Sequence, residues 1–228
     1  MVLVHGAWHG AWCWEKVLPL LDGAGVPTVA VDLPGPGDLP AEAAAVGRAL
    51  DGLGGPALLC GHSYGGMVVT EAGLHPAVVH LVYVAGFVAG PGTSLRDLLA
   101  ADAGWPRLSL DVGEDGLTRP DPATLQRLYH DCEPADAGAA RARLRPQHRR
   151  SFAQPLSAAA WESVPSTYAV CARDQAVNPD LQRSMATQAG SELLEWPVGH
   201  SPFLSRPHLV AGLLTELARQ WPGRGASA

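Results

Sequence analysis

The sequence has no apolar stretch long enough to cross a bilayer, and it carries little excess charge of either sign. A membrane-spanning helix needs about 20 consecutive apolar residues, and the apolar runs here are much shorter. The formal net charge of −6 argues against a nucleic-acid-binding surface, which requires a strong basic excess. We therefore expect neither a membrane nor a nucleic acid as a partner.

Cysteine is scarce and unpatterned. Cys13, Cys60, Cys132 and Cys171 show no metal-ligand spacing, and two of them end apolar runs, where a buried free thiol is usual. The N-terminal MVLVHGAWHG lacks the basic region and the cleavage site of a signal peptide. These features predict a reduced, cytoplasmic protein. The one basic stretch, residues 141–150, is interpreted as a solvated helix face rather than an anion or partner site.

Hydrophobic residues make up 47% of the 228 residues and charged residues 17%, which is typical of one globular domain. Short apolar runs alternate with longer segments of helical character. Expected strands begin at Val2, Thr28, Ala57, Val78, Ser166 and Glu192, and expected helices span 14–22, 41–53, 64–74, 179–189 and 207–220. Most of these strands lack period-two alternation, which indicates burial on both faces. The pattern predicts an α/β fold with a mostly parallel central sheet flanked by helices.

Residues 87–162 interrupt this alternation. They contain no convincing strand, several Pro and Gly breaks, and short helical pieces such as SLRDLLAA and ATLQRLYHD. Apolar residues at helical spacing favour an ordered helical cap over a disordered loop. We expect a core of residues 1–86 and 163–228, with a small helical cap, residues 87–162, inserted after the fourth predicted strand. The C-terminal GRGASA is expected to be a frayed tail.

The segment LLCGHSYGG places Ser63 between Gly61 and Gly65, in a Gly-x-Ser-x-Gly pattern. A buried strand enters this turn and a helix, MVVTEAGL, leaves it. Such a turn strains the backbone at its central residue, and the glycines let strand and helix approach closely. The context favours a nucleophile elbow, which presents the serine oxygen at the carboxyl edge of the sheet, over an ordinary glycine-rich turn.

A serine nucleophile needs a base, and the base needs an orienting carboxylate. Among nine histidines, His200 is the best candidate, because it follows the strand ELLEW at the sheet edge that carries the elbow. Asp174 follows the strand STYAVCA, and the orienting role is preferred there over that of a helix N-cap. Asp32 precedes the serine and suits a loop-fixing role better. The order Ser63, Asp174, His200 is that of α/β-hydrolases.

An oxyanion formed at this serine would also need hydrogen-bond donors. In this fold they are the N–H after the nucleophile, here Tyr64, and one from the loop after an early strand. In the loop HGAWHG, Gly6 allows close approach and Ala7 presents its N–H. Each such donor typically contributes about 3 to 4 kcal/mol of transition-state stabilisation. His5 is interpreted as structural, and the side chain of His62 is expected to point away from the serine oxygen.

Four segments carry a resemblance to a known family: VLVHGAWHGAWCWEKV, LLCGHSYGGMV, VPSTYAVCARDQAVNPDLQ and GHSPFLSRPHLV. They resemble the α/β-hydrolases grouped around plant methylesterases and hydroxynitrile lyases, with many bacterial esterase relatives. The resemblance is weak through residues 87–162. It implies an α/β-hydrolase fold and no metal or organic cofactor. It also implies a catalytic triad and two oxyanion donors at the positions already singled out: Ser63, Asp174, His200, Ala7 and Tyr64.

Two positions separate the chemistries within this family. Its cyanohydrin-cleaving members carry threonine in place of Gly6, and lysine directly after the catalytic histidine, where this chain has Ser201. Both differences favour ester hydrolysis. We expect a cofactor-independent serine carboxylesterase that hydrolyses small to medium apolar carboxylic esters, methyl esters among them, through an acyl-enzyme. The alternatives are a lyase-like or biosynthetic enzyme that uses the same triad without hydrolysis, and a ligand receptor on a hydrolase scaffold.

Four aromatic residues are candidates for an apolar acyl pocket under the cap: Trp8, Phe87, Trp105 and Trp161. Phe87 is the strongest, because it follows a strand end at the cap entrance and its family match lies near the pocket. For Trp105 and Trp161 a core role is at least as plausible. The expected substrate-binding residues are therefore Gly6, Trp8 and Phe87, and the expected partner is a small-molecule ester.

Overall fold

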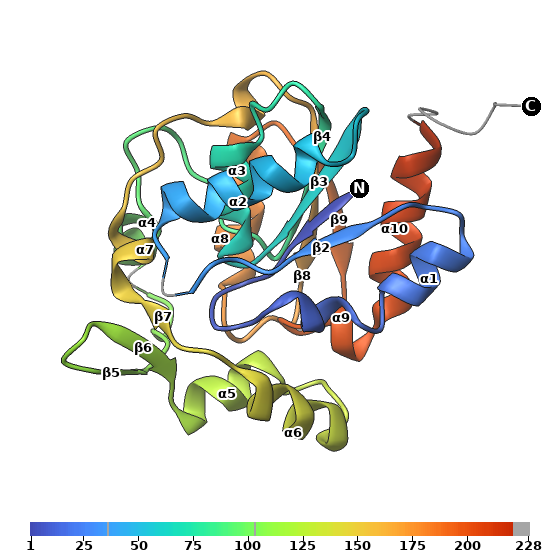
Figure 1. Ribbon diagram of the computed structural model, residues 1–228. Coiled ribbons are helices and arrows are strands. Elements are labelled where there is room, and N and C mark those ends of the chain that lie inside the picture. The colour runs from blue at the N-terminus through green and yellow to red at the C-terminus, as the bar shows by residue number, and fades with distance from the viewer. Residues whose placement is uncertain (36, 103, 221–228) are drawn as a thin grey trace, which may run out of the picture.

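The computed structural model describes residues 1–35, 37–102 and 104–220, and its centre is a parallel sheet (Figure 1). The strand order is β2-β1-β3-β4-β8-β9, and each neighbouring pair in this sheet is parallel. The strands are β1 (Val2–Val4), β2 (Val29–Val31), β3 (Ala57–His62), β4 (Val78–Val84), β8 (Ser166–Cys171) and β9 (Glu192–Trp196). The expected parallel α/β architecture is confirmed. The expected C-terminal tail lies outside the described residues.

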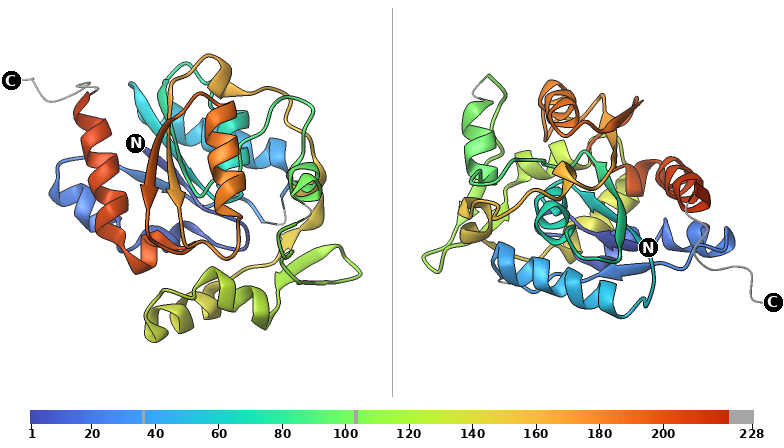
Figure 2. Two further views of the ribbon diagram at one scale, coloured as in Figure 1. Left: turned by 180° about the vertical axis from the view of Figure 1, so that it is seen from behind. Right: turned by 90° about the horizontal axis from the view of Figure 1, so that it is seen from above.

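Helices cover both faces of the sheet, because successive residues of its inner strands are apolar on both sides (Figure 2). Val4 packs with α2 (Leu39–Asp51), α3 (Gly65–Ala72) and α8 (Pro179–Gln188). Leu3 faces the opposite cluster, formed by η1 (Ala11–Trp14), α1 (Leu18–Gly23), α9 (Pro202–Ser205) and α10 (Pro207–Gln220). Loops at the strand ends are thereby held between two packed layers.

The helix expected at residues 14–22 begins later than predicted, because η1 and a turn precede it and α1 starts at Leu18. Pro19 has no N–H to bond to the carbonyl four residues earlier, so it fits only the first turn of a helix, where α1 places it. Two other helices begin at side-chain caps. Asp38 accepts the Ala41 N–H of α2 at 3.0 Å, and Asn178 accepts the Asp180 N–H of α8 at 3.0 Å.

Residues 87–162 contain strands as well as helices, so the expectation of no strand there is wrong. A small antiparallel sheet joins β5 (Leu110–Val112), β6 (Leu117–Pro120) and β7 (Gln147–His148). These strands are too short to give a periodic signal in the sequence. The only local cue to a hairpin was Gly116, which has φ of 77° in the turn between β5 and β6. The helices of the segment are α4 (Leu95–Ala101), α5 (Pro122–Leu128), α6 (Pro134–Arg143), α7 (Arg149–Ala153) and η2 (Ala160–Glu162). The boundaries proposed for the cap stay a prediction.

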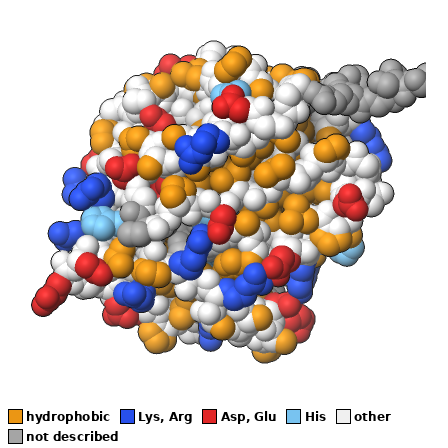
Figure 3. Space-filling view, viewed as in Figure 1, with side chains coloured by type: hydrophobic (Ala, Val, Ile, Leu, Met, Phe, Trp, Pro, Cys, Tyr) orange, Lys and Arg blue, Asp and Glu red, His pale blue; other side chains and the backbone are white. Residues whose placement is uncertain are grey.

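Ion pairs tie this segment to the core. Arg143 contacts both carboxylate oxygens of Glu15 at 2.7 Å, and Arg145 contacts Asp32 at 2.9 Å. Figure 3 shows positive and negative side chains side by side where α6 meets the core. The basic stretch at residues 141–150 is therefore more than a solvated helix face. Within the described ranges, no helix has both the length and the apolar composition that crossing a membrane requires.

Candidate active site

The turn between β3 and α3 holds Ser63 in a left-handed backbone conformation, with φ of 52°. Close contacts on both sides require glycine. A Cβ on Gly61 would lie 2.5 Å from the Gly65 carbonyl oxygen, and one on Gly65 would lie 2.6 Å from the His5 carbonyl oxygen. The strain and the two close approaches are the features expected of a nucleophile elbow. The turn leaves Ser63 8% exposed at the carboxyl end of β3.

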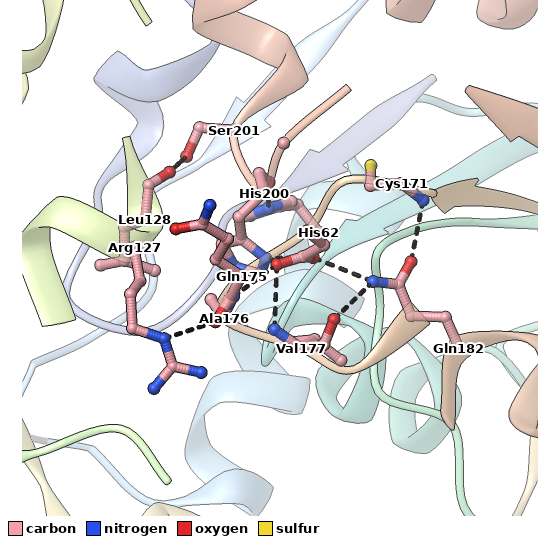
Figure 4. Close-up of polar contacts among 12 residues, drawn as sticks. His62, Arg127, Leu128, Cys171, Gln175, Ala176, Val177, Gln182, His200 and Ser201 are labelled. Carbon is pink, nitrogen blue, oxygen red and sulfur yellow. Dashed lines mark hydrogen bonds and ion pairs between the residues drawn. The ribbon is translucent and has the colours of Figure 1, made fainter. Parts of the chain in front are cut away.

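Asp174 and His200 come from the loops after β8 and β9 and meet in the interior. His200 Nδ1 lies 2.7 Å from Asp174 Oδ2, and both residues are almost completely buried. Asp174 also accepts the N–H groups of Ala176 at 2.7 Å and Val177 at 2.9 Å, and Gln182 Nε2 at 2.9 Å. In Figure 4, Gln182 reaches from α8 towards this loop. Asp174 therefore does not cap α8 and is free to orient the histidine.

The hydrogen bond to Asp174 fixes how His200 can act. The carboxylate accepts the Nδ1–H, which leaves Nε2 with a lone pair that can take a proton. His62 Nε2–H donates to the His200 carbonyl oxygen at 2.8 Å, and burial keeps the pKa of His62 well below its usual range. Figure 4 shows the two histidines together. An uncharged His62 thus supports the backbone of the candidate base.

Ser63 and His200 line the same cavity, but their side chains are not joined directly. In the part of the chain that the structure describes, no hydrogen bond connects Ser63 Oγ to the imidazole. Such bonds are often long without substrate and tighten when it binds. The structure therefore pairs Asp174 with His200 and places Ser63 on the same cavity wall as His200.

The residues of the expected oxyanion site, Ala7 and Tyr64, lie at this cavity. Neither of their N–H groups donates a hydrogen bond within the described residues. Gly6 lies directly beside the elbow, because a Cβ there would be 2.9 Å from both His62 Nδ1 and Ser63 Cβ. The arrangement matches a pair of donors held next to a candidate nucleophile.

Two buried histidines brace the loop after β1. His5 Nδ1–H donates to the Gly6 carbonyl oxygen at 2.8 Å, as its expected structural role requires, and burial lowers its pKa to about 4. His9 was not singled out from the sequence. Its Nδ1–H donates to the Ala7 carbonyl oxygen at 2.7 Å, its Nε2 accepts the Tyr129 hydroxyl at 2.8 Å, and burial lowers its pKa to about 3. Both histidines are uncharged, and their hydrogen bonds hold the backbone of the loop that carries Ala7.

The cavity has a volume of about 320 Å³ and lies between the carboxyl edge of the sheet and the 87–162 segment. Trp8, Phe87 and Trp105 line it, as expected of pocket residues. Trp161 does not line it and instead donates its Nε1–H to the Ala89 carbonyl oxygen at 2.9 Å. Several other lining residues come from the 87–162 segment, among them Leu95, Leu99, Leu110 and Phe152. Only their apolar character, and for Leu95 and Leu99 their spacing along α4, could have suggested them.

A parallel sheet covered on both faces, with a strained serine and a His–Asp pair at its carboxyl edge, defines a protein of the α/β-hydrolase fold. Within residues 1–35, 37–102 and 104–220, no three His, Cys, Asp or Glu side chains group as a metal site would require.

The chain belongs to the alpha/beta hydrolase family, whose sequence profile matches residues 1–213. It is 30% identical to the alpha/beta hydrolase nvfD of Aspergillus novofumigatus, over 96% of each chain. It is 27% identical to methyl jasmonate esterase 1 of Vitis vinifera, over 96% of this chain and 97% of that protein. Among solved structures, the methylesterase protein MES16 from Arabidopsis matches with a TM-score of 0.78 and 26% identity, over 96% of this chain and 98% of that one.

Proposed function

We propose that this protein is a cofactor-independent serine carboxylesterase. The observation that carries the proposal is one apolar cavity lined by the strained Ser63, by His200 in contact with Asp174, and by Ala7 and Tyr64, whose N–H groups donate no hydrogen bond within the described residues. Nucleophile, base, orienting carboxylate and oxyanion donors are the parts that acyl transfer to serine requires. The grape and Arabidopsis relatives, which are named as esterases, support an ester as the substrate.

Acylation follows from the positions of these groups. His200 Nε2 takes the hydroxyl proton of Ser63 while Oγ attacks the ester carbonyl carbon. Charge develops on the carbonyl oxygen, which would accept hydrogen bonds from the Ala7 and Tyr64 N–H groups. Collapse of the tetrahedral intermediate breaks the bond to the alkoxy oxygen, and the imidazolium of His200 protonates the departing alcohol.

Deacylation repeats these steps with water as the nucleophile. His200 removes a proton from water, the hydroxyl oxygen attacks the acyl carbon, and Ser63 leaves with the proton returned by the imidazolium. The Asp174 carboxylate accepts the Nδ1–H of His200 and stabilises the charged imidazole in both halves of the reaction. The Asp174–His200 contact of 2.7 Å suits this role.

The cavity supports a small to medium apolar ester. A volume of about 320 Å³ walled by residues such as Phe87, Trp105 and Leu99 suits an apolar acyl or alcohol group. Gly6 and Ser201 stand where cyanohydrin-cleaving relatives carry threonine and lysine, which disfavours a lyase. Ser201 is also engaged structurally, since its hydroxyl donates to the Leu128 carbonyl oxygen at 2.8 Å. Methyl esters of apolar acids are the first substrates to test.

A panel of p-nitrophenyl and methyl esters of increasing acyl length, assayed beside Ser63→Ala, tests the proposal. We expect measurable turnover with short and medium apolar acyl groups, and loss of nearly all turnover in Ser63→Ala with an unchanged unfolding curve. Equal turnover in the variant would exclude the serine mechanism. Cyanide release from mandelonitrile without ester turnover would indicate a lyase, and tight binding without turnover would indicate a receptor.

A further inference from the structure

A buried carboxyl group lies behind the proposed oxyanion site. Glu42, on α2, is 2% exposed and does not line the cavity. Its Oε2 accepts the Tyr64 hydroxyl, and its Oε1 accepts Gln147 Nε2 at 3.3 Å. The core residue Glu42 thus joins the residue after the proposed nucleophile to β7 of the 87–162 segment.

Gln147 continues this connection to the second oxyanion loop. Its Oε1 accepts the Trp8 N–H at 3.2 Å, and Trp8 directly follows the proposed donor residue Ala7. Trp8 has φ of 63°, a conformation that non-glycine residues adopt at a cost. The path from Tyr64 through Glu42 and Gln147 therefore ends on a strained residue next to Ala7.

An aromatic contact runs parallel to this path. The Phe152 ring of α7 packs edge-on against Tyr64, with centroids 5.4 Å apart, and against Trp8, with centroids 5.9 Å apart. Trp8 and Tyr64 are thus linked twice: their side chains both pack on the Phe152 ring, and hydrogen bonds through Glu42 and Gln147 join the Tyr64 hydroxyl to the Trp8 backbone N–H. The contacts of Trp8 and Tyr64 with Phe152 do not involve Glu42. Packing of these rings therefore does not explain why a carboxyl group is buried beside them.

Burial makes this carboxyl group expensive to keep. Desolvation raises the pKa of Glu42 to about 7, and the hydrogen bond from Tyr64 opposes the rise. Replacing a buried ionic network by apolar side chains of similar volume often leaves the stability of the folded protein unchanged or increases it. Burying the Glu42 carboxyl group costs free energy, and its hydrogen bonds lead to Tyr64 and, through Gln147, to Trp8. A role for Glu42 in the proposed oxyanion site would explain why the carboxyl group is there.

We propose that Glu42 is a positioning residue for the oxyanion site, holding Tyr64 directly and Trp8 through Gln147 so that the Tyr64 and Ala7 N–H groups converge on one point. The inference rests on the proposed esterase function and adds a residue to its machinery. Glu42 touches no reacting atom and acts only through the residues that it bonds. A donor displaced from the oxyanion stabilises the transition state less while ground-state binding in the cavity is unchanged.

Two variants cut the bridge at different bonds. In Glu42→Leu, the side chain has no acceptor for either the Tyr64 hydroxyl or Gln147 Nε2, so both contacts of the bridge are lost. In Tyr64→Phe, the hydroxyl is removed while the ring and the proposed N–H donor remain. Glu71→Gln is the matched control, because Glu71 is a carboxylate on α3 that bonds Ser157 of the 87–162 segment but does not line the cavity.

The readouts are steady-state kinetics over the ester panel and the affinity for a trifluoromethyl ketone, whose hemiketal with Ser63 carries an oxyanion. We expect both variants to lower kcat by about 10-fold for every ester, with KM within about twofold of wild type. The ketone should bind about 10-fold more weakly, and the product acid should bind as before. Glu71→Gln should match wild type in all of these measurements.

The possible outcomes separate this inference from the proposed function. Variants that lose only unfolding stability, or whose losses depend on the acyl group, would overturn the positioning role and leave the esterase proposal intact. If wild type hydrolyses no ester yet binds the ketone through Ser63, weaker ketone binding by both variants still supports the role, and unchanged binding overturns it. A wild-type protein that neither hydrolyses esters nor binds the ketone would overturn both.

Discussion

Gly6→Ala places a methyl group between the oxyanion loop and the elbow. The added Cβ would lie 2.9 Å from His62 Nδ1 and 2.9 Å from Ser63 Cβ, against an ordinary carbon contact of about 3.5 to 4.0 Å. Both neighbours are buried, so neither side chain can swing into solvent. We expect the loop and the elbow to separate by about 0.5 to 1 Å, the difference between these two distances.

A displacement of this size matters because it separates the proposed donor Ala7 from the proposed nucleophile. Misplacing a catalytic group by about 1 Å can cost about 100-fold in rate, which corresponds to about 3 kcal/mol of transition-state stabilisation. We therefore expect Gly6→Ala to lower kcat/KM for p-nitrophenyl butyrate by between about 10- and 100-fold.

Steady-state kinetics and urea unfolding of the same preparations separate this effect from loss of fold. Gly47→Ala is the matched control, because a Cβ at this position in α2 meets nothing within 4 Å. It should leave kcat/KM unchanged and raise the free energy of unfolding by roughly 0.5 to 1 kcal/mol. A folded Gly6→Ala protein with wild-type kcat/KM would refute the steric reasoning and the placement of the oxyanion site.

Three further outcomes are expected. Gln182→Met leaves the buried Cys171 N–H without its acceptor and Asp174 without one donor. Urea unfolding should therefore show a free energy of unfolding lower by about 1 to 3 kcal/mol, and steady-state kinetics a lower kcat. Wild-type values in both measurements would contradict a supporting role of Gln182 for Asp174. Because burial raises the pKa of Glu42 from 4.5 to about 7, its folded carboxyl holds a proton more tightly than the unfolded chain does. Its contribution to stability is complete below pH 4.5 and is lost, by up to about 3 kcal/mol, as pH rises through about 7. Unfolding at pH 5 and pH 8 should show this slope in wild type and a flatter one in Glu42→Gln. Finally, an ester with a remote carboxylate should show a higher kcat/KM than its neutral analogue at low salt, and the preference should fall as salt is added, because exposed arginines line the cavity: Arg96, Arg107 and Arg149.

The geometry of the candidate site could be predicted where it follows from sheet topology. Parallel strands end at one edge, so the residues just after β3, β8 and β9 had to lie near one another. This is why Asp174 and His200, 26 positions apart, were expected together and lie 2.7 Å apart. The Gly-x-Ser-x-Gly spacing likewise predicted a strained Ser63, which has φ of 52°.

Contacts that depend on the fold of residues 87–162 could not be predicted. The short strands β5, β6 and β7 carry little periodic signal, and their pairing brings Gln147 to Glu42, 105 positions away in sequence. Local patterns predict local structure, whereas a buried pair of polar side chains forms only once both elements are packed. From the sequence alone, Glu42 is an ordinary residue of an amphipathic helix. Its contacts with Tyr64 and Gln147 become visible only in the folded structure.

Trp8 illustrates how this segment supports the core. Its φ of 63° costs roughly 1 to 3 kcal/mol for a non-glycine residue. Three hydrogen bonds from residues 87–162 oppose that cost. Gln147 Oε1 accepts the Trp8 N–H at 3.2 Å, the Trp8 carbonyl oxygen accepts the Arg145 N–H at 2.8 Å, and Thr118 Oγ1 accepts the indole N–H at 3.0 Å. At about 1 kcal/mol each, these bonds are of the size needed to hold the conformation. A segment that supplies cavity walls therefore also fixes the backbone beside Ala7, so changes in it should alter the rate of reaction as well as the choice of ester.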